Sequence, residues 1–152
     1  MTHLSFPRTC KAGEIFYNYL YNYSTFESTY RHEAKSIETH YQDGKSFDSL
    51  ILKKNIWGVT QRLFILDRIS NSVKHRGISF LVTDPEDFNL MTYFIDQRIS
   101  VGEYSVIERQ GRNINALHEP IDPQLSYAKG INIDLSMEHS QRYNMSLIVE
   151  LK

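Results

Sequence analysis

Two histidines with a neighbouring carboxylate are the residues best suited to acid–base chemistry. His118 and Glu119 lie in a proline-containing loop over 118–130, and His139 lies in a polar turn over 138–144. Imidazole and carboxylate side chains can exchange protons near neutral pH, and active sites are commonly built on loops that a rigid sheet holds. One hypothesis is therefore a small hydrolase, phosphodiesterase or nucleotide-processing enzyme that uses all three residues. This hypothesis requires the three side chains to lie close together in the fold. The alternative is that they are solvated loop residues without a catalytic role.

A second group pairs basic side chains with aromatic ones. Arg109 and Arg112 lie beside an expected hairpin turn at Gln110-Gly111, in a chain with 10 tyrosines. Positive charge beside aromatic rings can hold a nucleotide or a single strand of nucleic acid. The alternative is a solvated charged surface. The formal net charge of −1 argues against a dedicated nucleic-acid binder but leaves a local basic patch open.

The tyrosine series is the most unusual local feature. Tyr17, Tyr19, Tyr21 and Tyr23 alternate with other residues, so they would share one face of a strand but spread around a helix. Tyrosine is enriched at protein interfaces. A partner-binding surface formed by these tyrosines, with Arg109 and Arg112, is one interpretation, and ordinary core packing is the other.

Motifs that mark cofactor and metal sites are absent from the sequence. It contains no phosphate-binding glycine-rich loop, no Gly-x-Ser-x-Gly, no His-Glu-x-x-His and no Cys-x-x-Cys. No cofactor or metal is therefore expected. Cys10 has no partner for an internal disulfide and is interpreted as a structural thiol in a protein of a reducing, cytoplasmic compartment.

Length and composition are those of an ordinary globular protein. The 152 residues suit a single domain over 1–152, and no apolar run is long enough to cross a membrane. Isoleucine and tyrosine are frequent and alanine is scarce, a bias typical of A+T-rich phage or mobile-element genes.

Helices are expected mainly in the first two thirds of the chain. Apolar residues over 14–42 fall three, four or seven positions apart, which predicts one helix or two short ones, although the aromatic part 14–26 could be a strand. A second helical stripe runs from Val59 to Val73. Asp84-Pro85 marks the start of a third helix, because Asp can cap free N–H groups and Pro suits the first helical position.

Strands are expected around that third helix and after it. Residues 78–82 predict a central strand, and 103–109 pairs with a strand after Asn113. Apolar and polar residues alternate strictly over 131–137 and 145–151, which predicts an antiparallel pair with one solvated face. The resulting fold class is α+β, with N-terminal helices packed on a mostly antiparallel sheet in two layers.

We expect, first, a small accessory protein that binds a macromolecular partner, most simply a protein, in the manner of a phage or bacterial inhibitor or immunity protein. Enzymatic and nucleic-acid-binding roles are the alternatives. The sequence names neither the partner nor the oligomeric state.

Overall fold

The computed structural model describes residues 6–7, 10–42, 45–52, 59–69, 74–138 and 142–152. The N-terminal half contains α1 (Lys11–Tyr21), α2 (Tyr23–Glu33), β1 (Ala34–Gln42), β2 (Lys45–Leu52), β3 (Val59–Ile69) and β4 (Lys74–Val82). The C-terminal half contains α3 (Pro85–Ser100), β5 (Tyr104–Gln110), β6 (Asn113–His118), the 3-10 helix η1 (Pro123–Leu125), β7 (Ala128–Met137) and β8 (Tyr143–Leu151).

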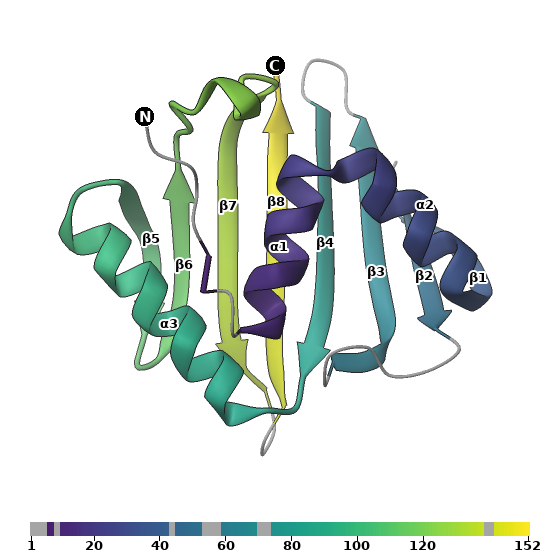
Figure 1. Cartoon of the computed structure of the whole chain (residues 1–152), viewed down its shortest axis with the longest axis horizontal. Coiled ribbons are helices and arrows are strands. Elements are labelled where there is room, and N and C mark those ends of the chain that lie inside the picture. The colour runs from purple at the N-terminus through teal and green to yellow at the C-terminus, as the bar shows by residue number, and fades with distance from the viewer. Residues whose placement is uncertain (1–5, 8–9, 43–44, 53–58, 70–73, 139–141) are drawn as a thin grey trace.

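The strands form one antiparallel sheet in the order β1-β2-β3-β4-β8-β7-β6-β5. Each half of the chain begins with helical structure and continues with four strands. The two halves pair through their last strands, β4 and β8. The helices α1, α2 and α3 all lie on one face of this sheet (Figure 1). The expected α+β class with helices packed on an antiparallel sheet is confirmed.

Both long helices of the core begin as their sequences require. Asp84 caps α3 by accepting a hydrogen bond from the Glu86 N–H at 2.9 Å, and Pro85 occupies the first turn. Cys10 caps α1, where its Sγ accepts from the Gly13 N–H at 3.4 Å. The aromatic segment 14–26 is helical on both sides of Asn22, which separates α1 from α2.

The core lies between the helix layer and the sheet. Phe16 of α1 packs on Phe80 of β4 with ring centroids 5.5 Å apart, and Phe88 of α3 stacks on Tyr143 of β8 at 4.6 Å. These contacts attach a helix of each half to the two central strands. Burying each large ring contributes about 2 kcal/mol.

Two segments expected to be helical are strands. Residues 34–42 form β1 and residues 59–69 form β3. Ile37, Thr39 and Tyr41 recur at alternate positions, so the segment also has a strand period, and the helical spacing in 59–73 runs through β-branched and aromatic residues. Pairing with β2 decides the conformation in both segments. The expectation that helices precede the sheet is also wrong, because four strands come before α3.

The remaining strand expectations are confirmed. Residues 78–82 belong to β4, which lies at the centre of the sheet, and residues 104–110 and 113–118 form the predicted hairpin. Gly111 adopts a φ of 61° in its turn, a conformation that glycine enters without steric cost. None of the helices in the described ranges is both long and apolar enough to span a bilayer.

Candidate functional site

The described helices leave one face of the sheet uncovered, and this face is called the open face below. Along β7, Ile131, Ile133 and Leu135 are buried beneath the helix layer, whereas Asn132 and Asp134 point the other way and are half-buried. The same alternation runs along β6 and β8. The open face is therefore more polar than the inner face, although Leu117 of β6 and Ile148 of β8 also lie on it.

A continuous row of polar side chains crosses five strands of the open face. The strand register pairs Glu108 of β5 with Asn115 of β6, and Asn115 with Asp134 of β7. Asp134 is in turn paired with Ser146 of β8, and Ser146 with Ser79 of β4. We call these five residues the polar row. Directly opposed residues on neighbouring strands lie close enough for their side chains to interact, so the row is a single surface built from distant parts of the sequence.

Hydrogen bonds fix several side chains of this face. The Ser146 hydroxyl donates to Ser79 Oγ at 3.1 Å, and the Ser79 hydroxyl donates to Asn144 Oδ1 at 3.2 Å. Asn132 Nδ2 donates to Asn115 Oδ1 at 2.6 Å. These bonds order the groups before any ligand arrives, which lowers the entropic cost of binding.

Two shallow hollows lie on the open face. The first, the β5–β7 hollow, has a volume of about 190 Å³. Its polar lining comes from Glu108, Gln110, Asn113, Asn115, Asp134 and Ser136. The second, of about 250 Å³, is lined by His75, Leu117, Gly130, Asn132, Ile148 and Glu150. A Cβ atom at Gly130 would lie 3.4 Å from Leu117 Cδ1, so a side chain there would occupy part of the second hollow.

Asp134 differs from the other shielded aspartates of the described chain. Asp87 accepts a hydrogen bond from the Ala12 N–H, Asp122 accepts one from the Tyr21 hydroxyl, and Asp48 forms an ion pair with Arg31. Within the described residues the half-buried Asp134 side chain has neither a hydrogen bond nor an ion pair. Burial, and secondarily the charge of Glu108, raises the pKa of the Asp134 carboxyl.

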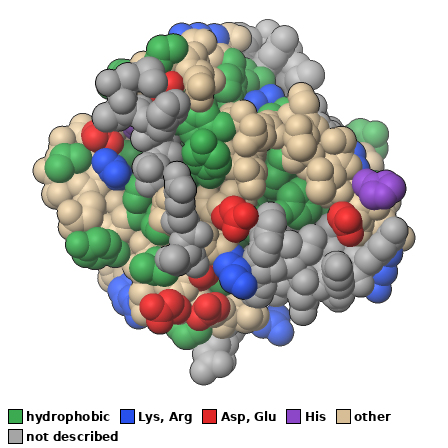
Figure 2. All heavy atoms as spheres, in the orientation of Figure 1, with side chains coloured by type: hydrophobic (Ala, Val, Ile, Leu, Met, Phe, Trp, Pro, Cys, Tyr) green, Lys and Arg blue, Asp and Glu red, His purple; other side chains and the backbone are tan. Residues whose placement is uncertain are grey.

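Acidic side chains are described both in the polar row and in the two hollows of this surface. None of the open-face residues of the polar row or of the two hollows is a lysine or arginine. Lys129, at the start of β7, forms an ion pair with Glu150 at 3.7 Å. By contrast, positive and negative side chains are interspersed on the helix side of the molecule (Figure 2). The polar side chains that line the two hollows are therefore uncharged or acidic apart from His75, and they lie beside the apolar Leu117 and Ile148.

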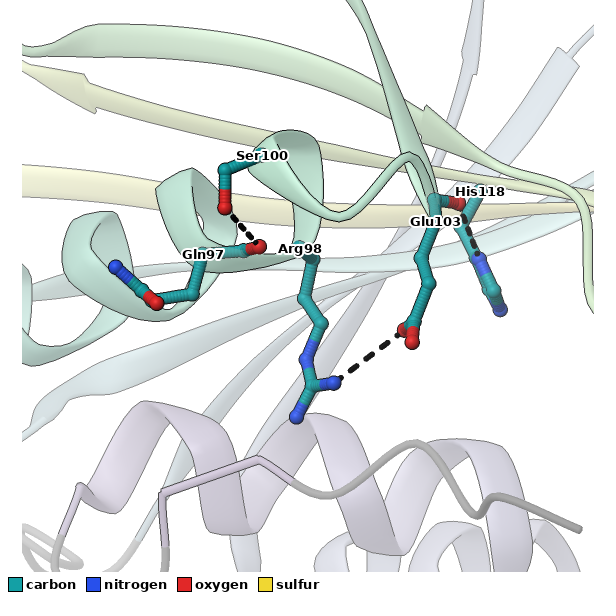
Figure 3. A network of polar contacts seen from close by, with 5 residues as sticks. All are labelled: Gln97, Arg98, Ser100, Glu103 and His118. Atoms are coloured by element: carbon teal, nitrogen blue, oxygen red, sulfur yellow. Dashed lines mark hydrogen bonds and ion pairs between the residues drawn. The ribbon is translucent and has the colours of Figure 1, made fainter.

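His118 is part of the packed fold. It is 8% exposed, its ring stacks on Tyr104 with centroids 4.8 Å apart, and its Nδ1 lies 3.1 Å from the Glu103 carbonyl oxygen. Figure 3 shows this contact beside the ion pair of Arg98 with Glu103. One face of the ring and one nitrogen therefore contact residues at the start of β5.

The other proposed catalytic residues do not gather around His118 in the described chain. Glu119 is exposed in the following loop, and His139 lies outside the described residues. His118 pairs with Ile131, whereas Glu138 follows the far end of β7 at Met137. Six residues of strand separate these positions by about 20 Å. Among the described residues no three metal-binding side chains cluster either.

The tyrosine series packs largely inside the helix layer. Tyr19 is fully buried and meets Tyr23 edge-on at 5.2 Å, while Tyr17, 38% exposed, stacks on Tyr21 at 4.7 Å. The Arg76 guanidinium lies 3.7 Å from the Tyr23 ring centroid and 5.0 Å from that of Tyr127. The tyrosine series therefore holds α1 and α2 against β4. Among its four side chains, Tyr17 is the most exposed to solvent.

The two arginines proposed for binding lie on the helix side. Arg109 forms an ion pair with Asp96 of α3, and the Arg112 guanidinium lies 5.2 Å from the Phe88 ring centroid. Arg112 is exposed and Arg109 has its charge partly neutralised. The structure thus places them apart from the polar row.

Comparison with protein-family models, with curated proteins and with solved structures finds no match for this chain.

Sequence reasoning found the alternation that makes the open face polar but missed the face as a site. The signal is the set of polar residues that alternate with apolar ones, namely Asn132, Asp134 and Ser136 in β7 and Asn144 and Ser146 in β8. What assembles it into a row is the register with β4, β5 and β6.

Proposed function

We propose that this chain is a non-enzymatic accessory protein, such as an inhibitor or immunity protein, which binds a protein partner through its open face. The observation that carries the proposal is the polar row. It combines the hydrogen-bonded side chains of Ser79, Ser146 and Asn115 with a half-buried carboxylate that has no partner in the described chain. A polar surface of this kind, without a deep enclosed cavity among the described hollows, suits a macromolecule better than a small molecule.

The charge of the open face favours a protein partner over a nucleic acid. Phosphate groups require basic side chains for affinity, whereas the β5–β7 hollow presents Glu108 and Asp134, and Glu150 of the second hollow is paired with Lys129. Arg109 and Arg112, on the other side of the sheet, could reach a phosphate backbone only along the edge at β5. The proposal therefore places the partner on the open face and identifies it as a protein.

Affinity capture with matched variants tests this proposal. Tagged wild type, Ser146→Arg and Gln97→Arg are used as bait in lysate of the native host, and captured proteins are identified by mass spectrometry. Ser146 lies in the polar row between Asp134 and Ser79, whereas Gln97 is exposed on α3. The same side chain is therefore added to opposite faces.

We expect a stoichiometric partner with wild type and Gln97→Arg that is lost with Ser146→Arg. The purified partner must then form a complex of defined mass with wild type. Because Ser146→Arg removes hydrogen bonds, Gln110→Arg, at the rim of the β5–β7 hollow, serves as a second disruptive variant. Equal capture by every bait, or a measured turnover with no stoichiometric partner, overturns the proposal.

A further inference from the structure

We infer that the second hollow of the open face is the anchor site for the protein partner, and that it takes the phenol ring of a tyrosine side chain. This inference rests on the proposed function and names the group by which the partner is recognised. The hollow has a volume of about 250 Å³, and its lining residues come from β4, β6, β7 and β8. Its walls, its floor and its unused hydrogen-bonding groups all match a phenol.

Two aliphatic side chains form the walls of the second hollow. Leu117 of β6 and Ile148 of β8 are both in register with Asn132 of β7, one on each side of it. Both side chains are only half-buried, which leaves apolar area in contact with water. Covering such area is favourable. The hollow therefore suits a ligand with an apolar body that can contact both walls.

A glycine keeps the space between these walls open. A Cβ atom at Gly130 would lie 3.4 Å from Leu117 Cδ1 and 4.0 Å from Glu150 Oε2, which are ordinary contact distances, and Gly130 does not have a positive φ. At Gly77, by contrast, a Cβ atom would lie 2.6 Å from the Leu147 carbonyl oxygen, so close packing requires the glycine. Glycine lowers the stability of a strand relative to alanine. Neither backbone conformation nor packing requires it at position 130, and its effect there is to leave room for a ligand.

Two polar groups beside this space have unused hydrogen-bonding capacity. Glu150 Oε1 forms the ion pair with Lys129 at 3.7 Å, whereas Oε2 is the oxygen that borders the open space above Gly130. His75 lies directly opposite Glu150 in the register, and its buried Nδ1 has no hydrogen-bond partner in the described chain. Buried polar groups of folded proteins normally have a partner. No hydrogen bond in the described chain fixes the imidazole, so rotation of the ring can turn a nitrogen towards the hollow.

Tyrosine matches these groups better than other side chains do. Its ring is apolar, and its hydroxyl can donate to Glu150 Oε2 while it accepts from the imidazole of His75. Phenylalanine lacks the hydroxyl, and tryptophan only donates. Lysine and arginine also only donate, and Lys129 already supplies Glu150 with a positive charge. Tyrosine is, in addition, enriched among the residues that contribute most to affinity at protein interfaces.

The direct probe is N-acetyltyrosinamide, and N-acetylphenylalaninamide is its matched control. Binding is followed in ¹⁵N–¹H correlation spectra of the labelled full chain. We expect the tyrosine compound to shift amide resonances within 129–133 and 147–151. The phenylalanine compound should bind about fivefold more weakly, because it lacks the hydroxyl that donates to Glu150. Equal affinity of the two compounds, or no shifts in these ranges up to the solubility limit of the probe, overturns the inference.

Matched variants locate the site. Gly130→Val fills the open space, whereas Ser136→Val places the same side chain on the same strand and face but outside the second hollow. We expect Gly130→Val to weaken binding of the tyrosine compound about tenfold or more, and Ser136→Val less than about twofold. Thermal unfolding checks that both variants fold. Equal weakening by the two valine variants overturns the assignment.

A second variant addresses the hydroxyl and applies even if Gly130→Val does not fold. Glu150→Gln keeps the size of the side chain but removes its charge, so the hydrogen bond from a phenol becomes weaker. We expect about threefold weaker binding of the tyrosine compound and unchanged binding of the phenylalanine compound. An equal effect of Glu150→Gln on both compounds overturns the role given to the hydroxyl.

The outcome is separable from that of the proposed function. If Ser146→Arg abolishes capture of a partner while the tyrosine compound fails to bind, the open face is the docking surface and the tyrosine anchor is wrong. If Ser146→Arg leaves capture intact, the proposed function fails, whereas shifts around the second hollow still show that it binds a phenol. With the purified partner, Gly130→Val should weaken the complex about tenfold or more, and an unchanged complex overturns the anchor role.

Discussion

The carboxylate of Asp87, on α3, accepts a hydrogen bond from the backbone N–H of Ala12 in the first turn of α1, at 3.1 Å. Both groups are buried, and the first four N–H groups of a helix have no partner within the helix. One half of the chain thereby completes the helix end of the other, although 75 residues separate the two positions.

Removing this carboxylate should destabilise the fold. We expect Asp87→Ala to lower the free energy of unfolding by about 2 kcal/mol, because a buried N–H loses its acceptor. Asp87→Asn should retain most of the stability, since an amide oxygen can still accept the bond and burial already raises the pKa of the acid. Urea denaturation measures both. Asp96→Ala, which breaks an exposed ion pair on the same helix, is the control and should cost less than about 1 kcal/mol.

Replacing Asp134 with asparagine should stabilise the fold at neutral pH, in contrast to the loss of stability expected at Asp87. Its folded-state pKa is raised, so the folded protein binds a proton more readily than the unfolded chain, and stability from this group is lost as the pH rises. We expect Asp134→Asn to be more stable than wild type by about 0.5 kcal/mol at pH 7. That advantage should shrink as the pH falls towards 3.8, the ordinary value for Asp. Thermal unfolding over pH 3.5–7 measures it, and an advantage that grows in acid would contradict the prediction.

Arg76 should contribute to stability through its aromatic surroundings. Its guanidinium lies against Tyr23, Tyr127 and, at 5.8 Å, Tyr19, so β4 is held to both N-terminal helices. We expect Arg76→Ala to cost about 2 kcal/mol and Arg76→Lys about half of that, because an ammonium group lacks the planar stacking surface. Arg112→Ala, which removes an exposed guanidinium from one ring, should cost about 0.5 kcal/mol. Equal effects of Arg76→Ala and Arg112→Ala in urea unfolding would refute the argument.

Cys10 should be unreactive while the protein is folded. Burial raises its pKa to about 12, and its Sγ is held by the Gly13 N–H and the Asp87 carbonyl. At pH 8 roughly one molecule in ten thousand is then a thiolate, which is the reactive form. A chromogenic disulfide reagent should therefore label the native chain at the rate of unfolding and the denatured chain at once. Rapid labelling under native conditions would show that this helix end opens readily.

The His118 side chain should stabilise the folded protein. We expect His118→Ala to lower the free energy of unfolding by about 2 kcal/mol, because the stacking on Tyr104 and the contact with the Glu103 carbonyl are both lost. The hydrolase alternative predicts instead that a folded His118→Ala variant loses turnover of a phosphodiester reporter such as bis-p-nitrophenyl phosphate. Wild-type turnover that His118→Ala and His139→Ala both abolish would establish that alternative.

The elements with strong local signals were predictable from the sequence. Asp84-Pro85 and the alternation over 131–137 are examples, since capping and a two-residue period act within a few positions. Residues 34–42 and 59–69 were not, because a short apolar run fits a helix or a strand until a neighbouring strand is known.

The candidate site shows the same limit. The polar alternation of β7 predicted a solvated face, but the alignment of Glu108, Asn115 and Asp134 depends on register between strands joined by turns and loops. Tyr17 to Tyr23 and Arg76 illustrate the converse: residues that suggest a binding surface by type can be used to pack a helix layer, and only three-dimensional contacts tell the two uses apart.

The central position of β8 has a consequence for how the chain acquires its structure. β8 is the last strand in the sequence. It nevertheless lies between β4 and β7 and pairs with both along nearly its whole length. Until it is inserted, each half is a four- or three-stranded meander with an unsatisfied inner edge. Contacts this distant in sequence slow folding, and such edges can recruit strands from other chains. The step that joins the two halves is therefore also the step at which this protein is most exposed to misassembly.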